Sequence, residues 1–596
     1  MVQSMLSTGI APSLIFIVGA LLIPFLKGRF KSAFMLSIPV LAFTILVNIP
    51  EGKHWVFSIL DYDLILGRVD RLSRIFGYIF TIISFISITF ALKVDDDVQH
   101  VSGLIYAGAT LGVTFAGDFF SLYIFWEIMA VASTFLILAR KTEKSQTAAF
   151  RYILVHLFGG LLLLVGIILY YQQRGTLEFD YIGLNGVASY LIFAGIALNA
   201  AIPPLHPWLK DAYPEATVTG AVFLSAFTTK SAVYVMARTF PGTELLIYLG
   251  AMMTALPIFY AVLENDIRRV LSYSLMNQVG FMMCGIGIGT QLAINGTVSH
   301  AFCHILYKAL LFMAAGSVLH MTGKIRCTDL GGLYKTMPLT CLFCLVGSAS
   351  ISAFPFFSGF ISKSMIVSAA AHNKLTFIWL ILQFASAGVV DHAGIKVPYF
   401  MFFGHDSGIR TREPPLNMII AMGIAAFFCI FIGIFPKPLY AILPFPVDYV
   451  PYTAAHVVGQ LQLLMFGALA FCLLILSGNY PAEIRAINLD TDWFYRKGSR
   501  LIYALADRGL NGINRICDKL FARGLPDLIG GFARKASTMM ILGFMVPVRF
   551  FTRENKFSPG PMGKHLEAIF ESGTVPLGVS VALAAIFLAG VMILLY

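Results

Sequence analysis

Four charged side chains stand alone within long apolar stretches of this chain: Glu127, Lys230, Lys308 and Lys396. A charge at the centre of a lipid bilayer costs about 2.5–3.5 kcal/mol on insertion scales. Charged residues persist in membrane segments where they pair with one another, face water or move ions. One acid and three bases in such positions indicate a path for protons or cations through a membrane.

The acid and the first base each have a second interpretation. Glu127 is the only charged residue between Asp118 and Arg140. Burial favours the neutral form of a lone carboxylic acid, so near a lysine this group could exchange a proton; the alternative is a structural ion pair. Lys230 lies mid-run, where a moving neighbouring charge could change its protonation. The alternative is a lysine that extends its ammonium to the interface.

Two histidines precede Lys308 at helical spacing. His300, His304 and Lys308 are four residues apart, which places them on one face of one helix. Because histidine titrates near neutral pH, His304 and Lys308 form a plausible relay step. The alternative for His300 is a histidine that only packs in the core. A metal site would require further ligands, so no metal is predicted here.

Two regions combine apolar content with helix breakers. The first, Ala200–Glu215, contains His206, and the second extends from Phe354 to Pro398. Proline frees a backbone carbonyl, which membrane proteins tolerate only where the gap lines a cavity or is buried in protein. Interrupted helices in both halves of a chain are typical of an ion site between repeats.

The second region also holds a small charged cluster. Asp391, His392 and Lys396 lie within it, and Asp391 could pair with Lys396 or with a loop. We expect Lys396 to belong to the path and treat Asp391 and His392 as accessory candidates.

Composition describes the elements that must position these residues. Of 596 residues, 58% are hydrophobic and 12% charged, against about 25% charged in soluble domains. This indicates an all-α polytopic membrane protein, whose first apolar run, Ile10–Leu26, we interpret as a retained span. Eight cysteines are scattered, and the pair Cys341 and Cys344 suits helix packing better than zinc. The sequence shows no nucleotide or haem motif, so we expect no bound cofactor and no redox catalysis by this chain itself.

Apolar runs of membrane-spanning length predict about fifteen helices from Ile10 to Leu476, and a last one at Val575–Tyr596. Alternate loops are basic, which places the N-terminus outside the cell membrane. The inside loops carry Lys27, Arg29, Lys31, Arg140, Lys141, Lys144, Arg268, Arg269, Lys324, Arg326, Arg410 and Arg412. The net charge of +11 is therefore mainly a topology signal, and nucleic acid is not an expected partner.

Residues 479–573 differ in character, being basic and only intermittently apolar. Leu501, Leu505, Ile513 and Ile516 recur at helical spacing, which predicts an amphipathic segment on the inner membrane surface or against a partner. Pro526 and Pro547 are expected to divide it. The alternative is a solvated tail, against which the final span argues.

Several motifs resemble a known family, the antiporter-like membrane subunits of Mrp antiporters, complex I and membrane-bound hydrogenases. The resemblance covers roughly residues 101–404. It rests on Phe125–Glu127, Pro204–Ala216, Asp266–Ser274, His304–Phe312 and Phe357–Lys363, while His392–Tyr399 and Leu489–Arg496 are more similar to the Mrp and hydrogenase branch.

This resemblance implies two inverted five-helix repeats, each with a broken helix. The implied division is 1–100 for N-terminal helices, 101–263 and 264–436 for the repeats, 437–478 for an additional helix, 479–573 for a lateral segment and 574–596 for an anchor helix. It implies a glutamate of the fifth helix at Glu127, a central lysine at Lys230, the lysine of the second repeat at Lys308 and an exit-side lysine at Lys396.

One position departs from the family pattern. Where the family places a lysine partner for the glutamate, this chain has Asn199. Another cation could pair with Glu127, Glu127 could rest protonated beside Asn199, or the site could favour Na⁺, for which carboxylate and amide oxygens are suitable ligands.

The sequence therefore predicts a multi-pass subunit of the cell inner membrane that moves protons, or exchanges them for Na⁺. Its expected partners are other membrane subunits of an Mrp-type or redox-driven complex and the lipid bilayer. The alternative is a non-conducting subunit whose lateral segment clamps its partners. A stand-alone redox enzyme is disfavoured.

Overall fold

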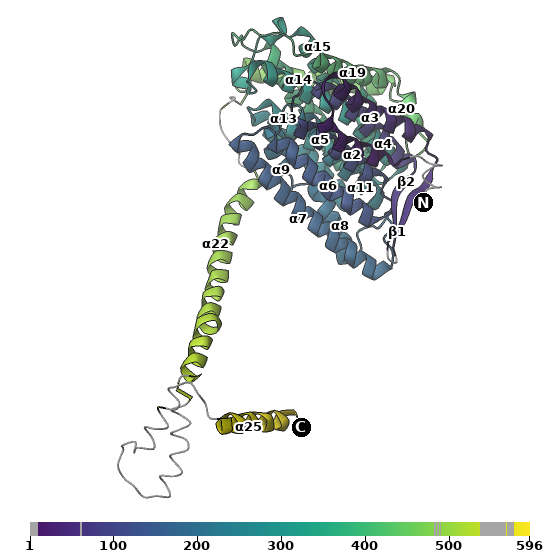
Figure 1. Cartoon of the computed structure of the whole chain (residues 1–596). Helices are drawn as coiled ribbons and strands as arrows, with labels where there is room; N and C mark the ends of the chain where they lie inside the picture. The colour runs from purple at the N-terminus through teal and green to yellow at the C-terminus, as the bar shows by residue number, and fades with distance from the viewer. Residues whose placement is uncertain are drawn as a thin grey trace, which may run out of the picture. The chain divides into compact units, whose positions relative to one another are not determined.

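The computed structural model describes residues 10–59, 62–481, 484, 488, 490–533, 535–536, 568 and 577–595. The chain forms two units, Met1–Asp492 and Trp493–Tyr596. Among the described residues, ten helices are long and apolar enough to cross a membrane, and three shorter helices are apolar. The predicted helical membrane fold is confirmed, and Figure 1 shows the helices of the first unit packed side by side.

The first unit begins with four helices and a hairpin. They are α2 (Pro12–Leu22), the 3₁₀ turn η1 (Ile23–Phe25), α3 (Gly28–Asn48), β1 (Gly52–Ile59), β2 (Tyr62–Val69), α4 (Arg71–Ala91) and α5 (Asp97–Phe115). The antiparallel hairpin, with Val56 opposite Ile65, joins α3 to α4. Asp70 caps α4 by accepting a hydrogen bond from the Ser73 amide.

The next helices contain the first break. They are α6 (Phe119–Leu138), α7 (Glu143–Arg174), α8 (Gly186–Asn199), α9 (Pro207–Ala212), the 3₁₀ turn η2 (Tyr213–Glu215), α10 (Gly220–Ala226) and α11 (Thr228–Thr239). After α8 the chain turns at Ala201, whose φ is 59°, and becomes helical again at Pro207.

The second half contains the second break. Its helices are α12 (Glu244–Leu263), α13 (Ile267–Ile288), α14 (Gln291–Thr322), α15 (Pro338–Ile351), α16 (Ser358–His372), α17 (Thr376–Val389), η5 (Val390–Ile395), α18 (Lys396–Pro398), η6 (Tyr399–Phe403), α19 (Leu416–Ile434), α20 (Lys437–Ala441) and α21 (Ala454–Leu476). Helix α14 contacts α4, α10, α13, α15, α16 and α19 and is buried along almost its whole length.

The interrupted region expected from Phe354 to Pro398 is two separate features. The true break lies between α15 and α16, where Ala353 has a φ of 57°. The stretch from Val390 to Phe403 is mostly π-helical and stays continuous with α17. The lysine beside the break is therefore Lys363, on α16, whereas Lys396 lies on the next helical stretch, which begins with α17.

The second unit contains α22 (Asp492–Cys517), the π-helical turn η7 (Asp518–Gly524) and α25 (Leu577–Leu595). The apolar residues Leu501, Leu505, Ile513 and Ile516 are exposed. The backbone remains helical through Pro526 to residue 533, so this proline does not end a helix; Pro547 lies outside the described residues.

Candidate functional site

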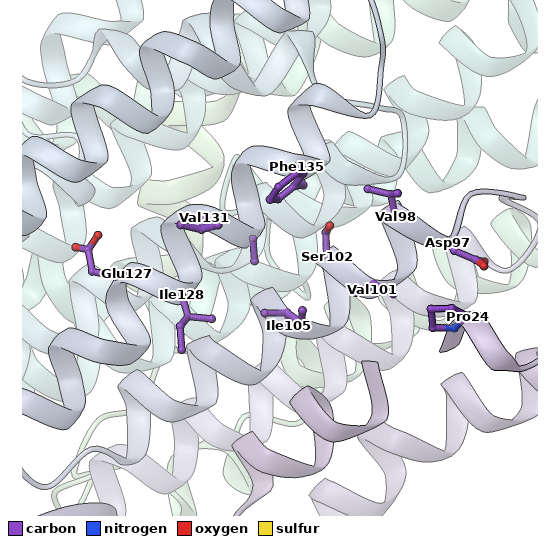
Figure 2. A pocket seen from close by; sticks show the side chains of 11 residues that line it. Pro24, Asp97, Val98, Val101, Ser102, Ile105, Glu127, Ile128, Val131 and Phe135 are labelled. Carbon is purple, nitrogen blue, oxygen red and sulfur yellow. The ribbon is translucent and has the colours of Figure 1, made fainter. Parts of the chain in front are cut away.

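Glu127 lies on α6 and reaches close to α7. A Cβ atom at Gly160 of α7 would lie 1.8 Å from Glu127 Oε1, so glycine makes room for the carboxylate. Among the described residues Oε1 has no hydrogen-bond partner. Glu127 also borders a cavity of about 560 Å³ with almost entirely apolar walls. Figure 2 shows Glu127 and Asp97 at opposite ends of the residues that line it.

Asn199 ends α8 just before the first break. Asn199 is fully buried, and neither its Nδ2 nor its Oδ1 has a hydrogen-bond partner among the described residues. The Leu198 carbonyl beside it accepts a hydrogen bond from Trp208 Nε1 at 2.9 Å, in addition to one from the Ala201 amide at 3.0 Å. Glu127 and Asn199 are thus both incompletely satisfied, on the two helices that flank α7 through Gly160 and Gly159.

Lys230 lies at the start of α11, directly after the discontinuity between α10 and α11. It is fully buried, and Nζ donates a hydrogen bond to the Ser225 carbonyl, 2.5 Å away, at the end of α10. Its charge interacts with those of His304 and Lys308 on α14. The central lysine is therefore electrostatically linked to the second half.

His300 belongs to a buried hydrogen-bond network. Its Nδ1 is 3.0 Å from Ser362 Oγ on α16, and its Nε2 is 3.2 Å from Gln278 Oε1 on α13. Gln278 in turn donates to Asn277 Oδ1, and Tyr307 donates to Gln278 Oε1. Because both nitrogens of His300 have partners, it connects α13, α14 and α16.

His304 and Lys308 differ from His300 in their hydrogen bonding. Both are fully buried, and among the described residues neither the His304 ring nitrogens nor Lys308 Nζ has a hydrogen-bond partner. The charge of Lys308 also interacts with that of Lys363. Buried, unsatisfied bases are costly unless water or a transported proton meets them.

Lys363 lies on α16 and stabilises the second break. Its Nζ donates to the Ile351 carbonyl, at the end of α15, over 2.9 Å. It also borders a second cavity, of about 450 Å³, between α16, α17 and α21. Polar side chains line this cavity: Ser364, Ser368, Gln383, Ser386, His456 and Gln460. The cavity extends to Ala371, near the end of α16, and to Thr453, just before α21.

Lys396 donates hydrogen bonds to several backbone carbonyls of a neighbouring helix. Its Nζ donates to three carbonyls at the end of α12: Ala261 at 3.3 Å, Val262 at 2.6 Å and Glu264 at 2.8 Å. Asp391 Oδ1 has no hydrogen-bond partner among the described residues, although its charge interacts with that of Lys396.

His392 is fully buried beside these residues. Its Nδ1 is 2.6 Å from the Gly388 carbonyl, and its charge interacts with that of Lys308. The three predicted residues are thus close in space, with Lys396 closing the end of a helix.

His206 lies at the first break, away from the buried bases. It is 1% exposed, and its Nε2 is 3.1 Å from Asp490 Oδ1, a residue that follows α21. Lys210, Tyr273 and Asp490 complete this cluster.

Sequence reasoning missed several members of these networks. Lys363 is itself a lone charge in an apolar run and satisfies the criterion that identified Lys308. The polar pair Asn277 and Gln278 interrupts an apolar stretch in the same manner. Asp490 carried no such signal, because its buried position depends on contacts with residues more than 200 positions away.

The sequence of this chain is similar to those of known membrane proteins. A family model described as "NADH:quinone oxidoreductase/Mrp antiporter, TM" matches residues 116–387. A Na(+)/H(+) antiporter protein of Alkalihalophilus pseudofirmus is 30% identical over 51% of this chain and 64% of its own length. Hydrogenase-4 component B of Escherichia coli is 26% identical over 62% of each chain.

Solved structures agree in fold. A chain from the structure of the membrane-bound sulfane sulfur reductase, an archaeal respiratory membrane complex, superposes with a TM-score of 0.65 at 26% identity, covering 76% of this chain and 98% of the other. A chain of the Mrp complex from Dietzia sp. gives 0.61 at 18% identity, over 81% and 98%. The aligned part spans less than two thirds of the first curated relatives' length.

Proposed function

Because residues 116–387 belong to the NADH:quinone oxidoreductase/Mrp antiporter transmembrane family, we propose that this chain moves protons across a membrane as one subunit of a multisubunit complex. Its partners are other membrane subunits and lipid, as in the complexes to which its relatives' names refer. The domain boundaries expected above, with repeats at 101–263 and 264–436, remain part of this proposal.

The line of buried bases carries the proposal. Lys230, His304, Lys308 and Lys363 interact electrostatically from helix to helix, and the first and last lie beside helix discontinuities. When one base gains a proton, Coulomb repulsion lowers the proton affinity of the next. A proton can therefore pass along the line without any large movement of the backbone.

We assign roles accordingly. Glu127 takes up the charge that starts a cycle, Lys230 is the central switch, His304 and Lys308 carry protons onward, and Lys363 exchanges them with the polar cavity. Asn199, His206, His300, Asp391 and His392 are accessory. Lys396, expected at the exit side, is assigned here mainly to stabilising α12.

The proton is favoured over Na⁺ by the surroundings of Glu127. Of the eleven residues that line the adjoining cavity, only Asp97, Ser102 and Glu127 carry polar side chains. A sodium ion would need several oxygen ligands at once. A carboxylic acid requires none of them to hold a proton.

The placement of ion pairs supports the alternation of loops between two sides, on which the proposed topology with the N-terminus outside the cell depends. Lys53 pairs with Glu178 and Arg68 with Asp180, all in loops expected outside. Lys31 pairs with Asp97 and Arg140 with Glu215, all expected inside. From its basic charge, we propose that the lateral segment lies on the cytoplasmic side of the cell inner membrane.

Replacing Lys230 tests the proposal. In the purified complex, reconstituted into proteoliposomes, Lys230→Ala should abolish proton flux while the complex still assembles. Lys335→Ala, which removes a half-exposed loop lysine, is the matched control and should pump normally. In the same vesicles ²²Na⁺ uptake should stay at background. Normal pumping by Lys230→Ala would refute the central switch, and sodium-dependent flux would refute the choice of ion.

A further inference from the structure

A carboxylate from the far end of the first unit is buried against the first break. Asp490 follows α21, yet its side chain is fully buried. Its Oδ1 accepts from the Thr491 amide at 2.6 Å and lies 3.1 Å from His206 Nε2. Its Oδ2 accepts from Tyr273 OH at 3.0 Å and lies 3.0 Å from Lys210 Nζ. A loop acid with this many partners is a built site rather than a surface contact.

Two carboxylates, Asp490 and Asp492, lie close to Lys210. Lys210 also pairs with Asp492 at 3.1 Å, so Asp490 is not its only counter-charge. Burial alone would raise the pKa of Asp490, but the hydrogen bond from His206 and the charge of Lys210 hold it below its usual value. Asp490 is thus a carboxylate. Thr491 adds a hydrogen bond to the Pro204 carbonyl, which fixes this segment on the break itself.

His206 is left with one nitrogen engaged and one open. A carboxylate that accepts from Nε2 fixes the tautomer of the ring and leaves a lone pair on Nδ1. Among the described residues, Nδ1 is buried and has no hydrogen-bond partner. His206 directly precedes Pro207, where α9 begins, so this open nitrogen belongs to the break.

We propose that Asp490 is a positioning residue that holds His206 as the proton acceptor at the cytoplasmic end of the first half. The proposal rests on the proposed function. The proton would arrive at Nδ1, and the Asp490 carboxylate would stabilise the imidazolium formed. Asp490 follows His206 by 284 residues in the sequence and yet contacts it. The segment after α21 would therefore contribute to the proton path of the first half.

A double-mutant cycle in the reconstituted complex tests this inference. Asp490→Asn keeps the shape but removes the charge, and His206→Gln removes the acceptor. Each should lower proton flux about tenfold, and the double variant should be no slower than either single one. Asp490→Glu should recover part of the flux lost in Asp490→Asn. Asp492→Asn, which removes the charge of the second carboxylate beside Lys210, is the control and should stay within twofold.

The outcomes separate positioning from simple anchoring. Effects that multiply in the double variant, or normal flux in Asp490→Asn, would overturn the inference. Flux that is normal in His206→Gln when expressed per assembled complex, with assembly quantified on native gels, would also overturn it. If Asp490→Asn does not accumulate, His206→Gln decides alone, because normal flux in that variant excludes the role. Lys230→Ala, measured in parallel, shows whether any failure concerns this inference or the proposed function.

Discussion

Lys363 donates a hydrogen bond to the carbonyl of Ile351 across the break between α15 and α16. At the first break, the carbonyl of Leu198 accepts its side-chain hydrogen bond from the neutral indole of Trp208, beside one from the Ala201 amide. The two breaks thus use different donors for the same task. Only at the second break does the donor carry a charge that can change, so the protonation of Lys363 and the geometry of the break are linked.

Replacing Lys363 should stop translocation while the fold persists. Lys363→Met should lower proton flux by tenfold or more, a loss of about 1.4 kcal/mol or greater. Lys374→Met, which changes an exposed lysine just beyond α16, is the matched control. Flux is measured in proteoliposomes and assembly by size-exclusion chromatography. Unchanged flux in Lys363→Met would show that the second cavity is not the route.

Alanine substitutions at two adjacent glycines of α7 should distinguish an effect on Glu127 from a general effect on helix packing. Gly160→Ala would place a methyl group 1.8 Å from Glu127 Oε1, and the carboxylate must move. Since a flexible side chain yields cheaply, we expect a stability change under about 1 kcal/mol but a flux loss of about tenfold. Gly159→Ala meets Leu198 at 3.3 Å and should be nearly silent. Equal effects of both variants on flux would contradict the assignment of Glu127.

Lys396 should act mainly on stability. Lys396→Met removes three hydrogen bonds to carbonyls at the end of α12, with an expected cost of about 2–3 kcal/mol. The melting temperature should fall clearly, while flux per assembled complex stays within about twofold. Lys396→Arg should restore most of the stability. Lost flux with an unchanged melting temperature would instead assign Lys396 to the path.

The pair of Asp70 and Arg238 should make stability depend on acid pH. Burial raises the pKa of Asp70, but the hydrogen bond and charge of Arg238 outweigh it and lower the pKa below 3.8. A lowered folded pKa gives stability that is complete above the unfolded value and is lost as pH falls through the folded one.

The destabilisation caused by Asp70→Asn should therefore be constant from pH 8 to about 5 and shrink below about pH 4. Thermal unfolding of the detergent-solubilised chain across this range gives the measurement. Asp63→Asn, in the exposed part of the hairpin, is the control. A difference that grows on acidification would contradict the ion pair.

The helices could be predicted well because apolar length and loop charge determine them almost locally. The burial of Lys230 and Lys308 could also be predicted, since a lone base is conspicuous in any apolar run. Lys396 looks the same in sequence, yet its partners are carbonyls more than 130 residues earlier, and only tertiary contacts show that. The β1–β2 hairpin was missed because eight-residue strands between spans carry a weak signal.

The polar cavity beside Lys363 also bears on how the protein would respond to voltage. At about 30 Å³ per molecule, its volume of about 450 Å³ has room for about 15 waters. A water-filled recess conducts ions, so a membrane potential would fall mostly across the dry protein beyond it, where each charge moved gains about 2.3 kcal/mol per 100 mV. The steps between Lys230 and Lys308, rather than the exchange at Lys363, would then carry most of the electrical work.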